Sequence, residues 1–537
     1  MSLDTSVASA PSPRPVATRR GLLAGILGTA AGHRFAPAMA AAQSWGTPLR
    51  TVAPAVAQGG EASSGTRPNI VLILLDDLDA EGVAHMPSVR ALLEERGTSF
   101  ANFFVTTPVC GPARASLLRG QYAHNHGMQA NTGANGGFST FHRLGRQAST
   151  VAVWPEAAGY QTAYFGKYLN GFPKGVGARD VPPGWVEWFG LASKQPSYFD
   201  YELNENGRLV AYGQDVEDYS TDVLAGKASD FVRRTLATGN PFFACVAPLA
   251  PHWPAVPAPR HAERFVDEPA PRSPSFNETD TGDKPQWVRE TPELSDDQIL
   301  EIDAQYRQRI RSLQAVDEMV ATLVETLEIG GGLENTVLLV TSDNGSFAGE
   351  HRLAAGKQAP YEEAIRVPLL VRGPGIAAKH SVAALALNVD LAPTIADLAG
   401  VTPPDFVDGR SLVPQLRGEQ PAAWRQAFLG ELFSPIKAND GGSAPGDSGE
   451  SGAGASEVPP YRAVRTADLL YVEYGTGERE FYDLRTDPAQ LDNTIMALDP
   501  DLQAHLTERL ERLTTCAGTT CRTVEDAPLD LPPPAVP

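Results

Sequence analysis

The sequence is short of positive charge. Its 537 residues include 44 Lys and Arg against 64 Asp and Glu, which gives a formal net charge of −20. A face that binds nucleic acid needs clustered Lys and Arg, so the composition argues against a nucleic acid partner. An anionic substrate would have to bind in a local positive pocket of an otherwise acidic protein.

Long apolar runs are also missing. A helix that spans a bilayer needs about 20 apolar residues, and no segment reaches that length, so we expect no membrane span. A short apolar run from Leu22 to Gly32 follows Arg19 and Arg20 and precedes small residues at 38–40. This arrangement predicts a twin-arginine type signal peptide over residues 1–42, with ordinary secretion as the alternative. We therefore expect an exported protein, periplasmic or extracellular.

Cysteine is scarce, with four in the chain. Cys516 and Cys521 lie close enough in sequence to close a short disulfide loop after export, although two free thiols fit the same spacing. Cys245 lies in an apolar segment and is expected to serve packing. The fourth, Cys110, lies at the start of an expected helix.

The length predicts one large domain and one smaller one. Residues 43–66 are rich in Ala, Gly, Ser and Pro, as linkers are, and the large domain is expected over 67–435. Residues 436–459 are dense in Gly, Ser and acidic side chains and predict a flexible insertion. The small C-terminal domain is expected over 460–537.

Within the large domain, expected strands alternate with expected helices. The continuous apolar run Ile70–Leu75 is typical of a central strand that is buried on both faces of a parallel sheet. Further strands are expected at Gln161–Phe165, Phe242–Ala247, Thr336–Thr341 and Val367–Arg372, and helices at Met86–Gly97, Tyr219–Leu236 and Asp297–Leu327. The alternation predicts an α/β fold, a large and mostly parallel sheet with helices on both faces.

The small domain has the pattern of an antiparallel sheet followed by a helix. Short strands with turn signals are expected at Tyr461–Arg465, Leu469–Tyr474 and Glu480–Leu484. A helix is expected from Pro500 to Leu513, with Asp499 as its N-cap.

Polar side chains follow two of the expected strands. Asp76 and Asp77 come directly after one strand, and Asp343 and Asn344 after another. Because sites in such sheets form at the carboxyl ends of the strands, the two pairs can meet at one edge. Their oxygen ligands suit Ca²⁺ or Mg²⁺ rather than zinc. Taken singly, each pair also fits an ordinary strand end or turn.

The stretch Thr107–Gly120 is expected to begin as a loop and continue as a helix. Pro112 suits the first turn because it lacks an N–H, so Cys110 is expected at or just before the helix N-terminus. Arg114 lies on the same face one turn later and places a permanent cation beside Cys110. A buried cysteine that only packs is the alternative interpretation.

The residues Cys110-Gly-Pro-Ala-Arg resemble the C-x-P-x-R signature of the type I sulfatases, and the resemblance extends from Pro68 to about Asn493. It implies the alkaline-phosphatase-like fold and a cysteine that a formylglycine-generating enzyme oxidises to Cα-formylglycine, whose hydrated aldehyde is the nucleophile. It also implies a divalent ion, usually Ca²⁺ with Mg²⁺ as the alternative. The implied metal ligands are Asp76, Asp77, Asp343, Asn344 and the modified Cys110.

Three more positions carry over from the resemblance. The segments around Lys167, His252 and Lys357 match the family's lysine loop, histidine loop and second lysine segment. Their side chains would contact the sulfate. Many sulfatases have a histidine two residues after the first lysine, where this chain has Leu169, so the histidine of the usual acid/base assignment has no counterpart at that position.

The form of residues 166–170 looks like the branch that contains the N-acetylglucosamine-6-sulfatases and the extracellular heparan sulfatases. The segment with His124 and His126 points to the same branch. These two histidines could contact substrate, or they could serve the structure.

The expected function is hydrolysis of a sulfate monoester. A sulfated sugar such as N-acetylglucosamine 6-sulfate is the first choice and an aryl sulfate the second. Lys167 and Lys357 would hold sulfate oxygens while His252 protonates the leaving oxygen. The alternatives are a phosphodiesterase or phosphonate monoester hydrolase on the same scaffold, and a secreted glycan-binding protein in which Cys110 stays a thiol.

Overall fold

The computed structural model describes residues 67–192, 197–433 and 457–529. All of them belong to one compact unit. The expected signal peptide (1–42) and linker (43–66) lie outside the described residues, as does the part of the expected insertion up to 456. Among the described residues, no helix combines the length and the apolar character that crossing a membrane requires.

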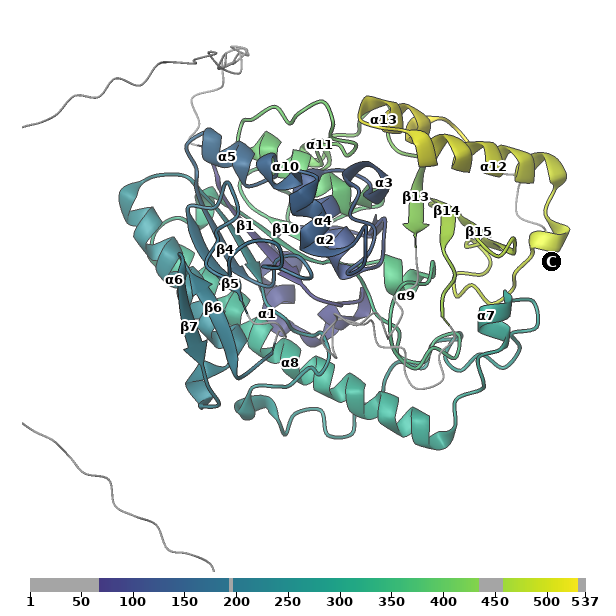
Figure 1. Ribbon diagram of the computed structural model, residues 1–537, viewed down its shortest axis with the longest axis horizontal. Helices are drawn as coiled ribbons and strands as arrows, with labels where there is room; N and C mark the ends of the chain where they lie inside the picture. Colours follow the sequence, from purple (N-terminus) through teal and green to yellow (C-terminus); the bar gives the residue numbers. More distant parts are fainter. Residues whose placement is uncertain (1–66, 193–196, 434–456, 530–537) are drawn as a thin grey trace, which may run out of the picture. The chain divides into compact units, whose positions relative to one another are not determined.

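A ten-stranded sheet forms the centre of the protein (Figure 1), in the order β11-β2-β10-β9-β1-β8-β4-β5-β6-β7. Its strands are β1 (Asn69–Leu75), β2 (Thr98–Phe100), β4 (Gln161–Gly166), β5 (Glu187–Leu191), β6 (Tyr201–Glu205), β7 (Arg208–Tyr212), β8 (Phe242–Ala247), β9 (Thr336–Ser342), β10 (Leu369–Arg372) and β11 (His380–Val382). The five central strands from β9 to β5 are parallel. β10 runs antiparallel to β9, and β6 and β7 add an antiparallel edge. The expected α/β fold with a mostly parallel sheet is confirmed.

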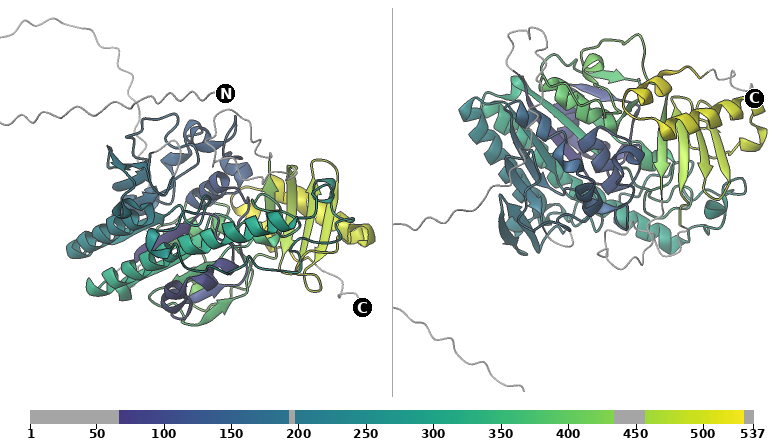
Figure 2. Two further views of the ribbon diagram at one scale, coloured as in Figure 1. Left: turned by 90° about the horizontal axis from the view of Figure 1, so that it is seen from below. Right: turned by 45° about the horizontal axis from the view of Figure 1, so that its top comes forward.

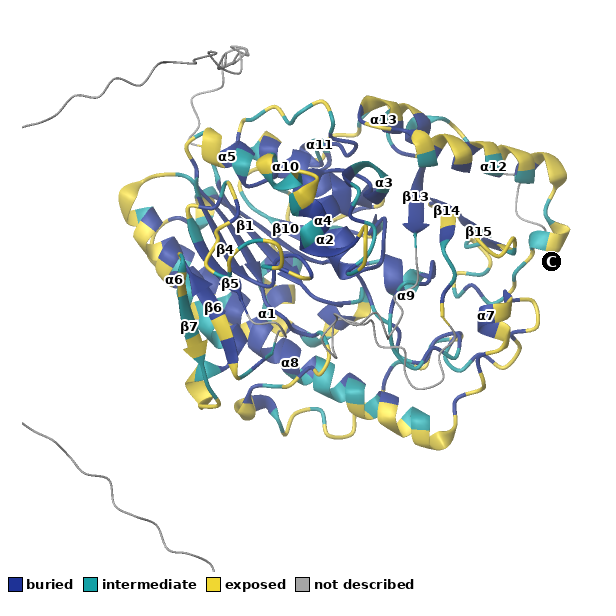
Figure 3. Cartoon of the chain, in the orientation of Figure 1, coloured by how far each residue is buried: buried dark blue, intermediate teal, exposed yellow. Residues whose placement is uncertain are grey.

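The central strand β1 contacts two hydrophobic cores. Ile70, Leu72 and Leu74 pack with α2 and α10 on one face, whereas the alternate side chains pack with α6 and α8 on the other. No residue of β1 is more than marginally exposed, as the dark blue strands of Figure 3 show. Burial on both faces explains why this strand is a continuous apolar run without polar alternation.

The helices are α1 (Pro87–Val89), α2 (Cys110–Arg119), α3 (Ala123–His126), α4 (Gly137–Arg143), α5 (Val153–Ala157), α6 (Ser220–Thr238), α7 (Gln286–Arg289), α8 (Asp296–Ile329), α9 (Glu362–Ile365), α10 (Leu391–Leu398), α11 (Val413–Leu416), α12 (Pro500–Thr515) and α13 (Thr519–Asp526). The long helix α8 begins with a capping box in which Ser295 and Gln298 exchange hydrogen bonds. The expected helix Met86–Gly97 forms as α1 and a π-helical turn over Arg90–Glu94.

A second sheet is antiparallel and has the order β13-β14-β15-β16. Its strands are β13 (Ala427–Leu432), β14 (Tyr461–Thr466), β15 (Leu469–Tyr474) and β16 (Arg479–Asp483). Figure 2 shows α12 lying across it. The expected N-cap is confirmed, because the Asp499 carboxylate accepts hydrogen bonds from the backbone of Asp501 and Leu502. β13 precedes the expected small domain, 460–537, so this sheet takes its first strand from before the insertion. A two-stranded parallel pair, β3 (Phe103–Phe104) and β12 (Ala386–Leu387), completes the strands.

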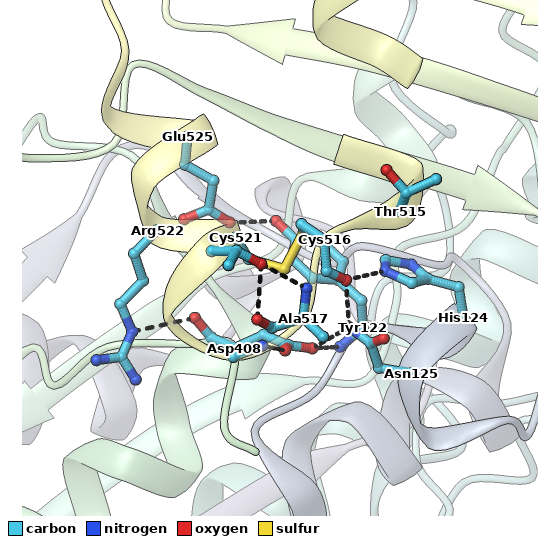
Figure 4. The surroundings of a disulfide bond; sticks show 12 residues. Tyr122, His124, Asn125, Asp408, Thr515, Cys516, Ala517, Cys521, Arg522 and Glu525 are labelled. Atoms are coloured by element: carbon cyan, nitrogen blue, oxygen red, sulfur yellow. Dashed lines mark hydrogen bonds between the residues drawn. A yellow bond between two sulfur atoms is a disulfide. The ribbon is translucent and has the colours of Figure 1, made fainter. Parts of the chain in front are cut away.

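A disulfide joins Cys516, just after α12, to Cys521 in α13 (Figure 4). The expected pairing is therefore present. The loop that it closes is anchored to the large domain, since the Cys516 carbonyl accepts hydrogen bonds from His124 and Asn125. Asp408 accepts a further hydrogen bond from the backbone N–H of Gly518, at 2.6 Å.

Replacing both cysteines, Cys516→Ser/Cys521→Ser, should lower the free energy of unfolding by about 2 kcal/mol, because a loop of about six residues is no longer closed in the unfolded chain. The urea midpoint of the oxidised protein should exceed that of the double variant. A reducing agent should lower the first midpoint and leave the second unchanged. Equal midpoints for the oxidised protein and the variant would contradict the expected contribution.

Candidate active site

The carboxyl ends of β1 and β9 bring the first predicted residues together. The two strands are parallel, with Leu75 opposite Ser342, so the residues that follow them emerge side by side. The backbone N–H of Asp77 donates to Asp343 Oδ1 at 3.1 Å, and Asn344 Nδ2 donates to Asp77 Oδ1 at 2.6 Å. The expected meeting of the two pairs at one edge of the sheet is confirmed.

Cys110 is the first residue of α2, after Val109 in an extended conformation. Its Sγ lies 3.4 Å from Asp76 Oδ1 and 2.9 Å from Lys357 Nζ. The resemblance assigns formylglycine to this position, and with that modification a hydroxyl of the aldehyde hydrate would take the place of the sulfur. The helix start thus places position 110 directly against the carboxylates.

Gly111, next to Cys110, is packed closely against two side chains. Its N–H donates to Asn131 Oδ1 at 2.8 Å. A Cβ at position 111 would lie 2.6 Å from the Met128 methyl group and 2.7 Å from Asn131 Oδ1, so a larger residue would displace this packing.

Three buried cations lie among the three carboxylates. Lys167, after β4, donates to Asp76 Oδ2 at 2.6 Å, and Lys357 pairs with Asp77. Arg114 Nε donates to Asp343 Oδ2 at 2.7 Å, and its Nη1 donates to the Lys167 carbonyl at 2.6 Å. All of these side chains are buried. The six formal charges therefore cancel.

The pKa values of the carboxyl groups respond to burial and to these cations. Burial opposes the charged form of Asp76, but Lys167 and the other nearby cations hold its pKa well below the ordinary value. The pKa of Asp77 is likewise lowered against burial, with Lys357 as the largest opposing influence. Burial and the charge of Asp76 raise the pKa of Asp343. Three adjacent carboxylates are thus not equally easy to ionise.

The pKa of the Cys110 thiol is raised well above its usual range, first by burial and then by Asp343. A neutral thiol is a poor nucleophile. The unmodified cysteine is therefore not an activated group in this environment.

His252 lies in the loop after β8 and faces the same site. Its Nε2 is 3.7 Å from Asp77 Oδ2, while its Nδ1 is 2.7 Å from the carbonyl oxygen of Trp253. Because a carbonyl oxygen can only accept, Nδ1 carries the proton of that hydrogen bond. Nε2 can then donate a proton only when the ring is doubly protonated.

One acceptor in the cluster has no hydrogen-bond partner among the described residues. Asn344 Oδ1 is shielded from solvent and accepts no hydrogen bond from any residue that the structure describes. Ligand atoms of Asp76, Asp77, Cys110 and His252 lie within 4.8 Å of one another and could hold a metal ion. Carboxylate oxygens and an unpaired amide oxygen form the donor set of a hard cation such as Ca²⁺ or Mg²⁺.

The side chains of Leu169, His124 and His126 contact other parts of the protein. Leu169 is buried in the hydrophobic core, so it adds no proton-transfer group. His124 lies between Glu431 and the Cys516 carbonyl. His126 contacts Ser116 Oγ, and burial lowers its pKa to about 3. These contacts support a structural role for both histidines.

Sequence reasoning missed Asn131 and Arg309. Arg309, on α8, donates to the Asp77 carbonyl at 2.7 Å and pairs with Asp79 at 3.2 Å. It is 232 positions from Asp77 in the chain. No local spacing could have indicated that contact, because it depends on how α8 packs on the sheet.

Comparison with known proteins shows the family to which the chain belongs. The sulfatase family model matches residues 68–401. The chain belongs to the sulfatase family. This sulfatase is 36% identical to goat N-acetylglucosamine-6-sulfatase over 491 residues, with 86% of each chain covered. It is 35% identical to an arylsulfatase of Volvox carteri over 517 residues, covering 86% of this chain and 76% of that protein.

A protein solved in complex with its substrate, D-glucosamine-2-N,6-O-disulfate, has the same fold as this sulfatase. The TM-score is 0.68 at 25% identity, covering 83% of this chain and 97% of the other. A phosphonate monoester hydrolase from Silicibacter pomeroyi also shares the fold, at 24% identity and a TM-score of 0.61, with 82% and 93% covered. That likeness shows the fold alone. The chain is an enzyme that hydrolyses sulfuric esters.

Replacing Arg114 by Met should destabilise the sulfatase by about 3–5 kcal/mol, because Asp343 loses its only hydrogen-bonded cation among the described residues while staying buried. The measurement is urea unfolding in EDTA, so that no divalent ion compensates. Adding Asp343→Asn should recover part of the loss, since the unpaired charge disappears. Additive losses in Arg114→Met/Asp343→Asn would contradict this account.

Proposed function

We propose that this sulfatase removes sulfate from a sulfated amino sugar, with Cα-formylglycine made from Cys110 as nucleophile and a bound divalent ion, Ca²⁺, as cofactor. The observation that carries the proposal is the position of Cys110 Sγ, within 3.4 Å of an Asp76 carboxylate oxygen and 2.9 Å of Lys357 Nζ. A cysteine that only packs has no need of a lysine and a carboxylate at hydrogen-bond distance.

The residues fit a divalent ion. Asp76, Asp77, Asp343 and Asn344 would hold it together with the group at position 110, and Asn344 Oδ1 supplies the unpaired acceptor. The protein charges of the cluster cancel, so a dication leaves two positive charges for an anionic ester. When bound, the ion would act as a Lewis acid on the sulfate and favour the ionised form of a hydroxyl beside it.

The reaction breaks the S–O bond to the sugar and leaves the alcohol with a proton. The aldehyde hydrate at position 110 would supply the attacking oxygen and a second hydroxyl through which the carbonyl reforms as sulfate leaves. Lys167 and Lys357 would donate to sulfate oxygens. His252 would pass the Nε2 proton of its doubly protonated ring to the leaving oxygen. Water restores the hydrate, so the products are the alcohol and inorganic sulfate.

The substrate class is supported by the relatives. The similar proteins include N-acetylglucosamine-6-sulfatases and arylsulfatases, and the solved neighbour holds a sulfated glucosamine.

We place this chain outside the cytoplasm, in keeping with the extracellular sulfatase among its relatives, and assign its export to a twin-arginine signal in residues 1–42. We also propose domain limits at 67–435 and 460–537, with the small sheet of the second domain completed by β13 from the first.

A formylglycine-generating enzyme is the implied partner in maturation. Cys110 is 1% exposed, so an enzyme that oxidises it must reach it before the chain has folded. We therefore expect the modification on the newly made chain, ahead of the burial of α2.

The peptide that contains Cys110, taken from protein made by its native host, should have the mass of the aldehyde, whereas the peptide with Cys245 should keep its thiol. Cys110→Ala should fold normally and lose turnover of N-acetylglucosamine 6-sulfate and of an aryl sulfate. Cys245→Ala serves as the matched control and should retain activity. Full activity of Cys110→Ala would overturn the proposed nucleophile. Faster turnover of an aryl phosphodiester than of both sulfates would favour the phosphodiesterase alternative.

Calcium should raise the unfolding temperature of the EDTA-treated protein. In Asn344→Leu, the Ca²⁺ concentration that gives half of this increase should be about tenfold higher or more, because the substitution removes an oxygen ligand. Asn204, a buried asparagine of β6 with its own hydrogen bonds, provides the control Asn204→Leu, which should lose stability but keep its response to Ca²⁺. An unchanged Ca²⁺ titration in Asn344→Leu would contradict the assigned site.

A further inference from the structure

A cavity of about 180 Å³ borders the candidate active site. It is lined by residues 253–255 after β8, residues 346–348 after β9, and the part of α8 from Glu301 to Arg309, with Ala354 and Ala355. Trp253 directly follows His252, and Ser346 lies two residues after Asn344. The cavity therefore adjoins the loop that carries the proposed proton donor to the leaving oxygen.

The wall formed by α8 is tied to the site. Arg309 lines the cavity and donates to the Asp77 carbonyl at 2.7 Å, while it also pairs with Asp79. This link fixes α8 against the segment that carries the metal ligands. A group bound in the cavity would keep a defined position relative to position 110.

The lining has the chemistry that binds a sugar ring. Trp253 is 45% exposed and offers an aromatic surface to C–H groups. Glu301, Gln305 and Gln308 recur on one face of α8, and Gln305 Nε2 lies 3.3 Å from Glu301 Oε1. Gln308 also lines the cavity, and its Oε1 accepts no hydrogen bond from any residue within the described ranges.

The size of the cavity favours one ring. Pockets for drug-sized ligands measure about 300–1,000 Å³, and this one is smaller. A second cavity, of about 220 Å³, is lined by Pro68, Asn335 and Val337 at the opposite ends of β1 and β9, so it cannot serve a group attached to the reacting sulfate.

The charge of the lining is unfavourable to a second anion. Among the described residues that line the cavity, Arg309 is the single cation, and it already donates to the Asp77 carbonyl and to Asp79. Glu301 is exposed at the rim and adds a negative charge. We propose that this cavity binds the sugar ring of the leaving alcohol and that Glu301 selects rings without a second sulfate. The inference rests on the proposed function.

Two sugars that differ only at the 2-amino group test the proposal, N-acetylglucosamine 6-sulfate and N-sulfoglucosamine 6-sulfate. Glu301→Arg should raise the ratio of kcat/KM for the disulfate to that for the monosulfate by about tenfold, since the rim charge changes by two units. Glu328→Arg makes the same change on an exposed residue at the far end of α8 and should leave the ratio unchanged.

Trp253→Ala should lower kcat/KM for both sugars by about tenfold or more, and Trp253→Phe should restore most of it. Absence of turnover of every sulfate ester by wild-type protein that carries the aldehyde would sink the proposed function. Normal turnover with no effect of Trp253→Ala, or with no change of the ratio in Glu301→Arg, would overturn the cavity proposal alone.

Discussion

The site depends on the compensation of three carboxylates that are buried within reach of one another. Alone, each would be protonated or would destabilise the fold, because a buried charge without a partner is costly. The compensating side chains are Arg114, Lys167 and Lys357, each paired with one of the carboxylates Asp343, Asp76 and Asp77. The balance also explains how an acidic protein could process an anion, since a bound dication would give this site a net positive charge.

The side chains of the site come from separate strands and a helix, and the sheet brings them together. β1 and β9 deliver the carboxylates because they are parallel neighbours, while β4 and β8 lie on the other side of β1 and deliver Lys167 and His252. Helix α2 approaches from the face of the sheet that carries Ile70, Leu72 and Leu74. All the strands therefore end at the same edge, where a helix N-terminus meets them.

Much of this arrangement could be predicted from local sequence. The run Ile70–Leu75 predicted its strand because burial on both faces leaves a continuous apolar pattern, and Pro112 marked the start of α2. The sequence did not reveal β13 as a member of the small sheet, nor the contact from Arg309 to Asp77. Those features depend on partners far away in the chain, whose approach is set by packing and leaves no periodic signal.

The proposed selectivity for rings with one sulfate depends on charges of opposite sign in two parts of the site, the carboxylate–cation cluster with its ion and the wall of the cavity. In the cluster of Asp76, Asp77 and Asp343 every carboxylate is paired with a cation, so a bound dication would make the cluster attract the sulfate that reacts. The wall of the cavity formed by α8 carries Glu301, and Arg309, the one cation among its described residues, already donates to Asp77 and Asp79. An anionic group would be attracted by the carboxylate–cation cluster only if it reaches that cluster. A second anionic group on the same ring would remain beside Glu301 in the wall of the cavity. Repulsion between Glu301 and that second group would then oppose binding of the ring, although the reacting sulfate of the same substrate would be attracted by the cluster.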